Sequence, residues 1–166
     1  MTIDTLFGPE EIPTKPRTIK FKQIKAVYET LKVSEDITNY ISQGTRYTAP
    51  DQIFETFKFL KHETKEHFMT LHLDGKNRIL CIDMVSVGSL NKSIVNVREV
   101  FKTALISSAA ALLLIHNHPS GDPTPSREDI EITKRLKEAG DLLSIRVLDH
   151  IIIGETYLSF VAQGLL

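Results

Sequence analysis

An uninterrupted run of apolar residues, 109–115, constrains the fold of this chain more than any other feature. The run is too short to cross a bilayer, which takes about 20 apolar residues in a helix. A continuous apolar segment of this length is typical of a strand that is buried on both faces. Because helical patterns lie before and after it in the sequence, we expect an α/β fold with a central sheet flanked by helices.

The expected elements divide the chain into an N-terminal helical leader, residues 1–47, and a domain over residues 48–166. The leader pattern predicts two short helices, over residues 19–32 and from Ser34 onward. Apolar spacing in the domain predicts further helices at residues 48–60, 97–105 and 126–139, the first capped by Thr48 and the last ended by Gly140. The predicted strands cover residues 69–73, 78–87, 94–97, 109–115 and 145–153.

Composition and charge exclude several classes of protein. Hydrophobic residues make up 42% and charged residues 25%, as in ordinary globular domains. The N-terminus lacks the apolar region of a signal peptide, and the one cysteine, Cys81, excludes an intrachain disulfide, so we expect a cytoplasmic protein without a membrane segment. The net charge of −1 gives no general attraction to nucleic acid. A basic cluster is the local exception, and a solvated helix face is its alternative interpretation: Lys15, Arg17, Lys20, Lys22 and Lys25.

Two histidines, His116 and His118, stand where the apolar run ends. Residues two apart on a strand point to the same face, so both imidazoles can aim at one point. Ligands of open α/β sheets bind outside the carboxyl ends of the strands. Asp129, in the first turn of the next predicted helix, can reach the same point. Two imidazoles and one carboxylate are a standard catalytic zinc set, so we expect one Zn²⁺ per chain with an open position for water.

The same residues also admit a purely structural interpretation. Ser126 and Asp129 have the spacing of a capping box, in which both only complete the start of a helix. A His-x-His pair is likewise compatible with a structural role. The sequence favours the metal site because burying two imidazoles without partners at the end of an apolar strand is costly, and a metal removes that cost.

A hydrolytic metal site also needs a base that takes a proton from the attacking water. Periodicity does not choose among the upstream acids, which are Glu55, Glu63, Glu66, Asp83 and Glu99. Glu66 is attractive because it precedes the first predicted strand of a hairpin, where its side chain could overhang the site.

His116-x-His118, followed by Ser126 and Asp129 at their spacing, resembles the JAMM signature of JAB/MPN-domain metalloproteases. The segments LLLIHNHPSGDPTPSREDIEITKRLKEAG and LDHIIIG resemble the RadC-like branch more specifically, over residues 49–166. The resemblance implies a JAB/MPN-like, cytidine-deaminase-like mixed sheet between helices, zinc, and metallopeptidase chemistry. The chain lacks the His-x-Glu and Pro-Cys-x-x-Cys of the zinc deaminases themselves.

The resemblance also implies roles for individual residues. Glu66 fits the position of the family's glutamate at the start of the first strand, with Glu63 as the fallback. Ser126 matches the serine that hydrogen-bonds the metal's water or the developing oxyanion. Asp149 and His150 recur in the resembling segment and would support a metal ligand, a structural pair on a strand being the alternative.

Two departures from the wider family bear on substrate and partner. Deubiquitinating members carry Ser or Thr between the two histidines, whereas this chain has Asn117, as RadC-like members do. The leader shows no Gly-rich hairpin like that of the helix-hairpin-helix region of full-length RadC proteins.

From the metal-ligand set and the family resemblance together, we expect a zinc-dependent amide hydrolase acting on a peptide or protein. The alternatives are a non-catalytic zinc-binding interaction module and a nucleic-acid-associated protein of DNA repair or mobile elements.

Overall fold

The computed structural model describes residues 27–29, 44–88 and 95–166. Residues 27–29 have no regular secondary structure, so the leader helix predicted over 19–32 is wrong at these positions. The second leader helix and the basic cluster fall outside the described residues. Within the described ranges, no helix is both long enough and apolar enough to cross a membrane.

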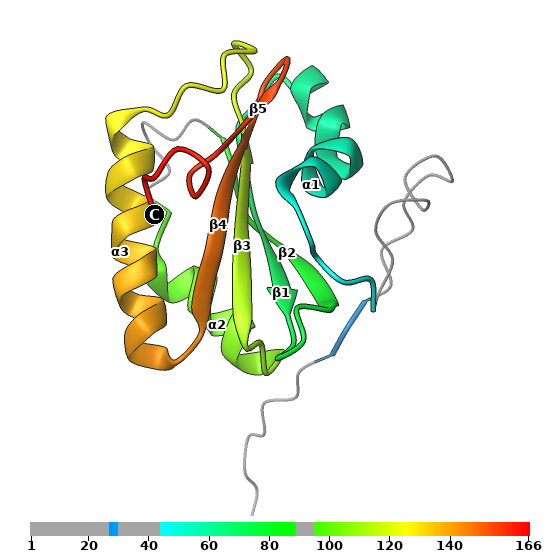
Figure 1. The fold of residues 1–166 in the computed structure, drawn as a ribbon, viewed down its shortest axis with the longest axis vertical. Helices are drawn as coiled ribbons and strands as arrows, with labels where there is room; N and C mark the ends of the chain where they lie inside the picture. Colours follow the sequence, from blue (N-terminus) through cyan, green and yellow to red (C-terminus); the bar gives the residue numbers. More distant parts are fainter. Residues whose placement is uncertain (1–26, 30–43, 89–94) are drawn as a thin grey trace, which may run out of the picture.

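A five-stranded mixed sheet, in the order β2-β1-β3-β4-β5, forms the centre of the domain (Figure 1). Strands β1 (His67–Leu73) and β2 (Ile79–Val87) form the predicted antiparallel hairpin. The central strand β3 (Ala111–Asn117) pairs antiparallel with β1 and parallel with β4 (Arg146–Ile153). A short edge strand that was not predicted, β5 (Tyr157–Ser159), pairs antiparallel with β4.

Helices cover both faces of this sheet, as predicted for the fold class (Figure 1). Helix α1 (Pro50–Phe57) and the 3₁₀ helix η3 (Lys58–His62) lie against one face. Helices α2 (Val97–Ile106) and α3 (Arg127–Leu143) lie against the other. Helix α3 connects β3 to β4, so its first turn lies at the carboxyl end of β3.

The core consists of two apolar layers that meet at β3. Leu113 and Ile115 pack in the layer under α1, and Leu112 and Leu114 pack in the layer under α2 and α3. All four side chains are fully buried, which confirms the two-faced burial predicted from the apolar run. Because strand residues alternate between faces, His116 continues the row of Leu112 and Leu114 toward α3.

Gly140 does not end α3, contrary to the prediction. The helix continues to Leu143 and ends at Ser144, which adopts a left-handed conformation with φ of 59°. A Cβ atom on Gly140 would lie 2.4 Å from the backbone oxygen of Ile145. The glycine is therefore required for the close approach of the chain entering β4, not for a helix end.

Two other predicted boundaries are also wrong. No strand reaches Val97, because Val97 begins α2 and the side chain of Asn96 caps that helix by accepting from the Arg98 N–H at 3.0 Å. At the start of α1 the capping residue is Ala49 rather than Thr48, and Pro50 occupies the first helical position. Proline is favoured there because its missing N–H would have no partner inside the helix.

Candidate metal centre

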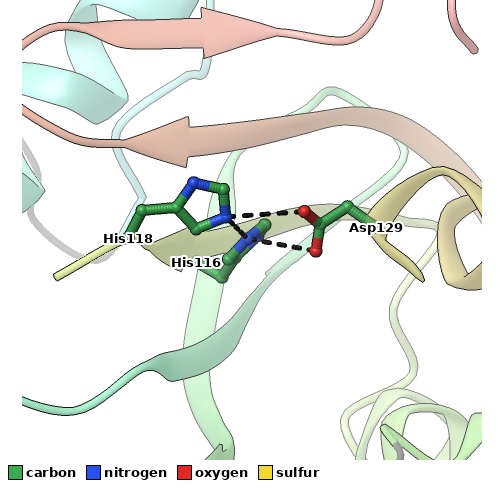
Figure 2. Close-up of side chains that lie close together, drawn as sticks. All are labelled: His116, His118 and Asp129. Carbon is green, nitrogen blue, oxygen red and sulfur yellow. Dashed lines mark hydrogen bonds and ion pairs between the residues drawn. The ribbon is translucent and has the colours of Figure 1, made fainter. Parts of the chain in front are cut away.

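The end of β3 brings His116 and His118 together beside the first turn of α3 (Figure 2). His116 is the last residue but one of the strand, and His118 follows the strand directly. The two Nε2 atoms lie 2.8 Å apart. His116 is fully buried, whereas the side chain of His118 keeps 13% of its surface exposed. The pair therefore lies at the boundary between the protein interior and the surface, with His118 on the outer side.

Asp129, on the first turn of α3, completes the cluster. Its Oδ1 lies 3.3 Å from Nε2 of His116, and its Oδ2 lies 3.4 Å from Nε2 of His118. Figure 2 shows the carboxylate spanning both rings. The structure thus places all three predicted ligands within 4.8 Å of one another, an arrangement that could hold a metal ion.

The capping box predicted as an alternative is present as well. The Ser126 hydroxyl accepts from the Asp129 N–H at 3.1 Å, and Oδ2 of Asp129 accepts from the N–H and the hydroxyl of Ser126 at 2.7 and 2.6 Å. The two interpretations are compatible because they use different oxygens of one carboxylate. Oδ1 is buried and has no hydrogen-bond partner among the described residues.

A chain of hydrogen bonds behind His116 fixes its tautomer. The hydroxyl of Thr133 donates to the Asp129 backbone carbonyl at 2.6 Å, so its oxygen accepts from Nδ1 of His150 at 2.6 Å. A neutral His150 then presents a lone pair at Nε2, which accepts from Nδ1 of His116 at 2.8 Å. Nε2 of His116 is left with a lone pair directed at His118 and Asp129.

His118 reaches the same state by another route. Its Nδ1 lies 2.7 Å from the backbone oxygen of Asp122. A carbonyl only accepts hydrogen bonds, so Nδ1 carries the proton and neutral His118 has its lone pair on Nε2. When both rings are neutral, two imidazole lone pairs and the unpartnered Oδ1 of Asp129 therefore converge on one point.

Burial and charge set the protonation of this cluster. Burial lowers the pKa of His116 to about 4, with Asp129 opposing and His118 reinforcing that shift. Burial likewise holds the pKa of His150 well below its usual value. Burial also acts to lower the pKa of His118, but hydrogen bonds to Asp129 and to the Asp122 carbonyl raise it overall. At neutral pH, His116 and His150 are thus uncharged. Metal binding requires a neutral His116, and the chain of hydrogen bonds from Thr133 to His116 requires a neutral His150.

The carboxylate of Asp129 remains ionised in this setting. Burial alone would raise its pKa, but hydrogen bonding to His118, Coulombic attraction to His116 when that ring is protonated, and the hydrogen bonds from Ser126 hold the pKa well below the usual range. A buried anion beside two imidazoles is stabilised by a positive charge, and its Oδ1 still has no hydrogen-bond partner among the described residues. The donor set therefore fits a divalent cation, and two imidazoles with one carboxylate suit zinc.

Glu66 lies at the same end of the sheet as the cluster. It directly precedes β1, where Phe68 pairs with His116 and lies with its ring centroid 6.0 Å from the imidazole. Glu66 is half-buried, and its charge contributes to raising the pKa of His118. Glu63, the fallback, is exposed at the end of η3.

The other candidate acids interact elsewhere. Glu55 forms an exposed ion pair with Lys58. Asp83 accepts from the Thr103 hydroxyl at 2.7 Å. Glu99 pairs with Lys102 on the surface of α2. Among the predicted acids, Glu66 is the one whose charge acts on a residue of the cluster.

The structure places Asp149 and His150 differently, although they are adjacent on β4. His150 contacts His116, as described above. Asp149 accepts from the N–H groups of His150 and Val161 and from the Ser159 hydroxyl, so its carboxylate holds the C-terminal turn. Sequence reasoning missed Thr133, although its position four residues after Asp129 on α3 places both on one helix face.

Comparison with known proteins bears on this centre. A profile of the RadC-like JAB domain matches residues 47–165. A UPF0758 protein of Geotalea uraniireducens is 63% identical over 124 residues, which cover 73% of this chain and 54% of that protein. A UPF0758 protein of Geobacter sulfurreducens is 52% identical over 152 residues, covering 90% of this chain and 66% of that protein.

An archaeal relative is similar over nearly the same region. A UPF0758 protein of Methanosarcina mazei is 46% identical over 148 residues, covering 87% of this chain and 63% of that protein. The chain thus spans 54–66% of the length of these relatives. The family profile covers the whole stretch that carries Glu66, the two histidines and Asp129.

Proposed function

Because this chain belongs to the RadC-like JAB domain family, we propose that it is a zinc-dependent metallopeptidase-type hydrolase that cleaves an amide bond in a peptide or protein. One observation carries the proposal: three candidate ligand atoms, from His116, His118 and Asp129, converge within 4.8 Å of one another. One of them, the buried Oδ1 of Asp129, has no hydrogen-bond partner among the described residues, and an unpartnered buried acceptor is costly. A bound cation satisfies all three at once.

The three side chains would hold one zinc ion and leave its fourth position open, as catalytic sites do. When bound, zinc supplies Lewis-acid chemistry and lowers the pKa of a water ligand toward about 7. The partial exposure of His118 provides the side from which water and substrate would enter.

Glu66 would move the protons of the reaction. Its position before β1 and its charge interaction with His118 support a role as the general base, which takes the proton from the attacking water. The same carboxyl group then donates that proton to the leaving amine as the peptide bond breaks. Such proton transfer contributes about 10²–10⁴-fold to rate in enzymes.

Ser126 would stabilise the developing oxyanion. Its hydroxyl is bonded to Oδ2 of Asp129 at 2.6 Å, so it lies beside the reaction centre. To serve the oxyanion, the hydroxyl proton must turn from Asp129 toward the substrate, while the Ser126 N–H keeps its own bond to Oδ2 at 2.7 Å. His150 would orient His116 from behind, and we assign Asp149 a structural role at the C-terminal turn.

Metal analysis of the purified protein tests the site. We expect one zinc per chain and loss of that zinc in His116→Ala and Asp129→Ala. Full zinc occupancy in both variants would reject the ligand assignment. Chelation with EDTA and reconstitution with Zn²⁺ should abolish and restore cleavage of a quenched fluorescent library of linear and isopeptide-linked peptides.

The base is tested with a pair of neighbouring acids. Glu66→Gln should keep its zinc and lose at least about 100-fold in kcat, whereas Glu63→Gln, four residues from β1 and exposed, should keep its activity. The reverse result would transfer the role to Glu63. A zinc-loaded protein that cleaves nothing in the library would instead favour the non-catalytic zinc-binding module.

A further inference from the structure

The residue between the two histidines, Asn117, is a fully buried polar side chain that takes no part in the metal cluster. On β3 its side chain points to the face opposite His116, toward the layer that contains Leu60 of η3. A buried amide is costly unless its donors and acceptor are bonded. The partners of Asn117 therefore indicate what the residue is for.

Within the described residues, this amide bonds to three backbone atoms, and two of them flank Glu66. Its Oδ1 accepts from the His67 N–H at 2.8 Å, and its Nδ2 donates to the carbonyls of Lys65 and Leu60 at 3.1 and 3.0 Å. The Lys65 carbonyl belongs to the peptide group before Glu66, and the His67 N–H belongs to the one after it. One side chain thus holds the backbone on both sides of Glu66.

The second of these peptide groups is fixed from the other side as well. The carbonyl of Glu66 accepts from the Gly88 N–H at 2.8 Å. The peptide group between Glu66 and His67 is therefore bonded to β3 through Asn117 and to the end of β2 through Gly88. This arrangement fixes where the Glu66 side chain leaves the backbone.

We propose that Asn117 is a positioning residue that sets the place of the Glu66 carboxylate relative to the metal ligands. The inference rests on the proposed role of Glu66. Because Asn117 ends β3 and lies directly between His116 and His118 in the sequence, it links the position of the base to the position of the ligands. A primary amide suits this task because it offers two N–H donors and one acceptor in one plane. A serine or threonine hydroxyl is shorter and offers a single donor, so it cannot donate to both the Lys65 and the Leu60 carbonyls.

Asn117→Ser provides the first test, with Asn117→Asp as a second variant that keeps the acceptor and removes both donors. The zinc-loaded Asn117→Ser protein should lose about 100-fold in kcat on the fastest-cleaved peptide of the library, because misplacing a reacting group by about 1 Å costs that much. KM and zinc affinity should change by less than about threefold, since the ligands stay in place. Leu113→Ala, on the same face of β3, is the matched control for lost stability, and its kcat should stay near that of the wild type.

A double-mutant cycle isolates the route of the effect. If Asn117 acts through Glu66, adding Asn117→Ser to Glu66→Gln should cause no further loss of kcat. An additive loss, or a loss in Leu113→Ala equal to that in Asn117→Ser, would overturn the proposal. So would a parallel loss of zinc, because Asn117 would then support the ligands instead of the base.

Amide hydrogen exchange provides a readout that needs no substrate. In the zinc-loaded protein the His67 amide should exchange more quickly in Asn117→Ser than in the wild type or Leu113→Ala, because the Oδ1 atom that accepts from it is removed and the serine side chain ends one bond nearer β3. Unchanged exchange would overturn the proposal whatever the kinetics show. If the wild type cleaves nothing, the hydrolase function fails, and the exchange of this amide alone decides whether Asn117 fixes the Glu66 backbone.

Discussion

His150 lies directly behind His116, with its Nε2 atom 2.8 Å from Nδ1 of His116. The contact extends through Thr133 to the backbone of Asp129, so the second ligand-bearing element is part of the same chain of hydrogen bonds. The candidate ligands His116 on β3 and Asp129 on α3 are thereby joined by one buried chain of hydrogen bonds that passes through His150 of β4. Outer contacts of this kind set the ring orientation and basicity of metal-binding histidines.

Breaking this connection should weaken metal binding without removing a ligand. Thr133→Val has nearly the same shape as threonine but cannot donate to the Asp129 carbonyl or accept from His150. We expect a loss of about 10–100-fold in zinc affinity, measured by competition with a chromophoric chelator. Thr133→Ser retains the hydroxyl and should bind zinc nearly as the wild type does. Equal affinities of the two variants would show that the hydroxyl has no part in ligand orientation.

The adjacent Asp149 should behave in the opposite way. Asp149→Ala removes the acceptor of three hydrogen bonds, from His150, Ser159 and Val161. Leaving buried donors unpaired costs about 1–3 kcal/mol each, so we expect a clear drop in the free energy of unfolding of the metal-free protein. Zinc affinity of the folded variant should stay near the wild-type value. A loss of zinc as large as that in Thr133→Val would place Asp149 in the support of the ligands after all.

The metal-free protein should lose stability as the pH falls from about 6.5 to about 4. The folded-state pKa of His116 is lowered by burial to about 4, and burial lowers that of His150 well below the ordinary histidine value of 6.5. Between these limits the unfolded chain binds protons that the folded chain does not, so acid favours unfolding. Each group contributes a slope of at most about 1.4 kcal/mol per pH unit. Urea denaturation in the presence of EDTA at a series of pH values measures the slope.

His118 and Asp129 affect the pH dependence of stability outside the range from pH 4 to 6.5. The raised pKa of His118 gives stability that is complete below 6.5 and is lost as the pH rises through its folded pKa. The lowered pKa of Asp129 gives stability that is lost only below 3.8. His150→Gln should therefore flatten the slope between pH 4 and 6.5, while His62→Gln, at an exposed position on η3, serves as the control. An unchanged slope in His150→Gln would contradict the neutral buried state of that ring.

Gly140→Ala should destabilise the protein although alanine is the better helix former. A Cβ at this position meets the Ile145 backbone oxygen at 2.4 Å, and backbone atoms cannot turn aside as a flexible side chain can. Overpacking of this kind costs about 1–3 kcal/mol, which exceeds the gain of up to about 1 kcal/mol in helix propensity. Thermal unfolding should show the loss. Gly75→Ala, in the hairpin turn with nothing within 4 Å of the added Cβ, is the matched control and should unfold near the wild-type temperature.

The sequence predicted what depends on short separations along the chain. The apolar run located β3, and the alternation of strand residues brought His116 and His118 to one point. Asp129 was within reach because the helix start follows the strand after one loop. The RadC-like resemblance is confirmed by the family match over residues 47–165, which includes the position of Glu66.

What depends on distant partners was not predicted. The amide of Asn117 bonds to backbone atoms 50 to 57 positions earlier in the chain, and the periodicity of side chains along the sequence contains no information about these partners. Gly140 looked like a helix end because its local pattern is that of one, whereas the approach of Ile145 decides its role. The partners of Thr133 include His150, 17 positions away on another element.

The three candidate ligand atoms come from one contiguous segment that comprises the end of β3, the following loop and the start of α3. Glu66 instead directly precedes β1, which pairs with β3 in the sheet. Under the proposed function, metal binding and substrate turnover are therefore encoded in separable segments of the chain. A substitution just before β1 would then abolish hydrolysis while the protein still binds zinc. Within this family, an intact histidine and aspartate set would identify members that bind a metal, and the residue before β1 would distinguish those that also hydrolyse a substrate.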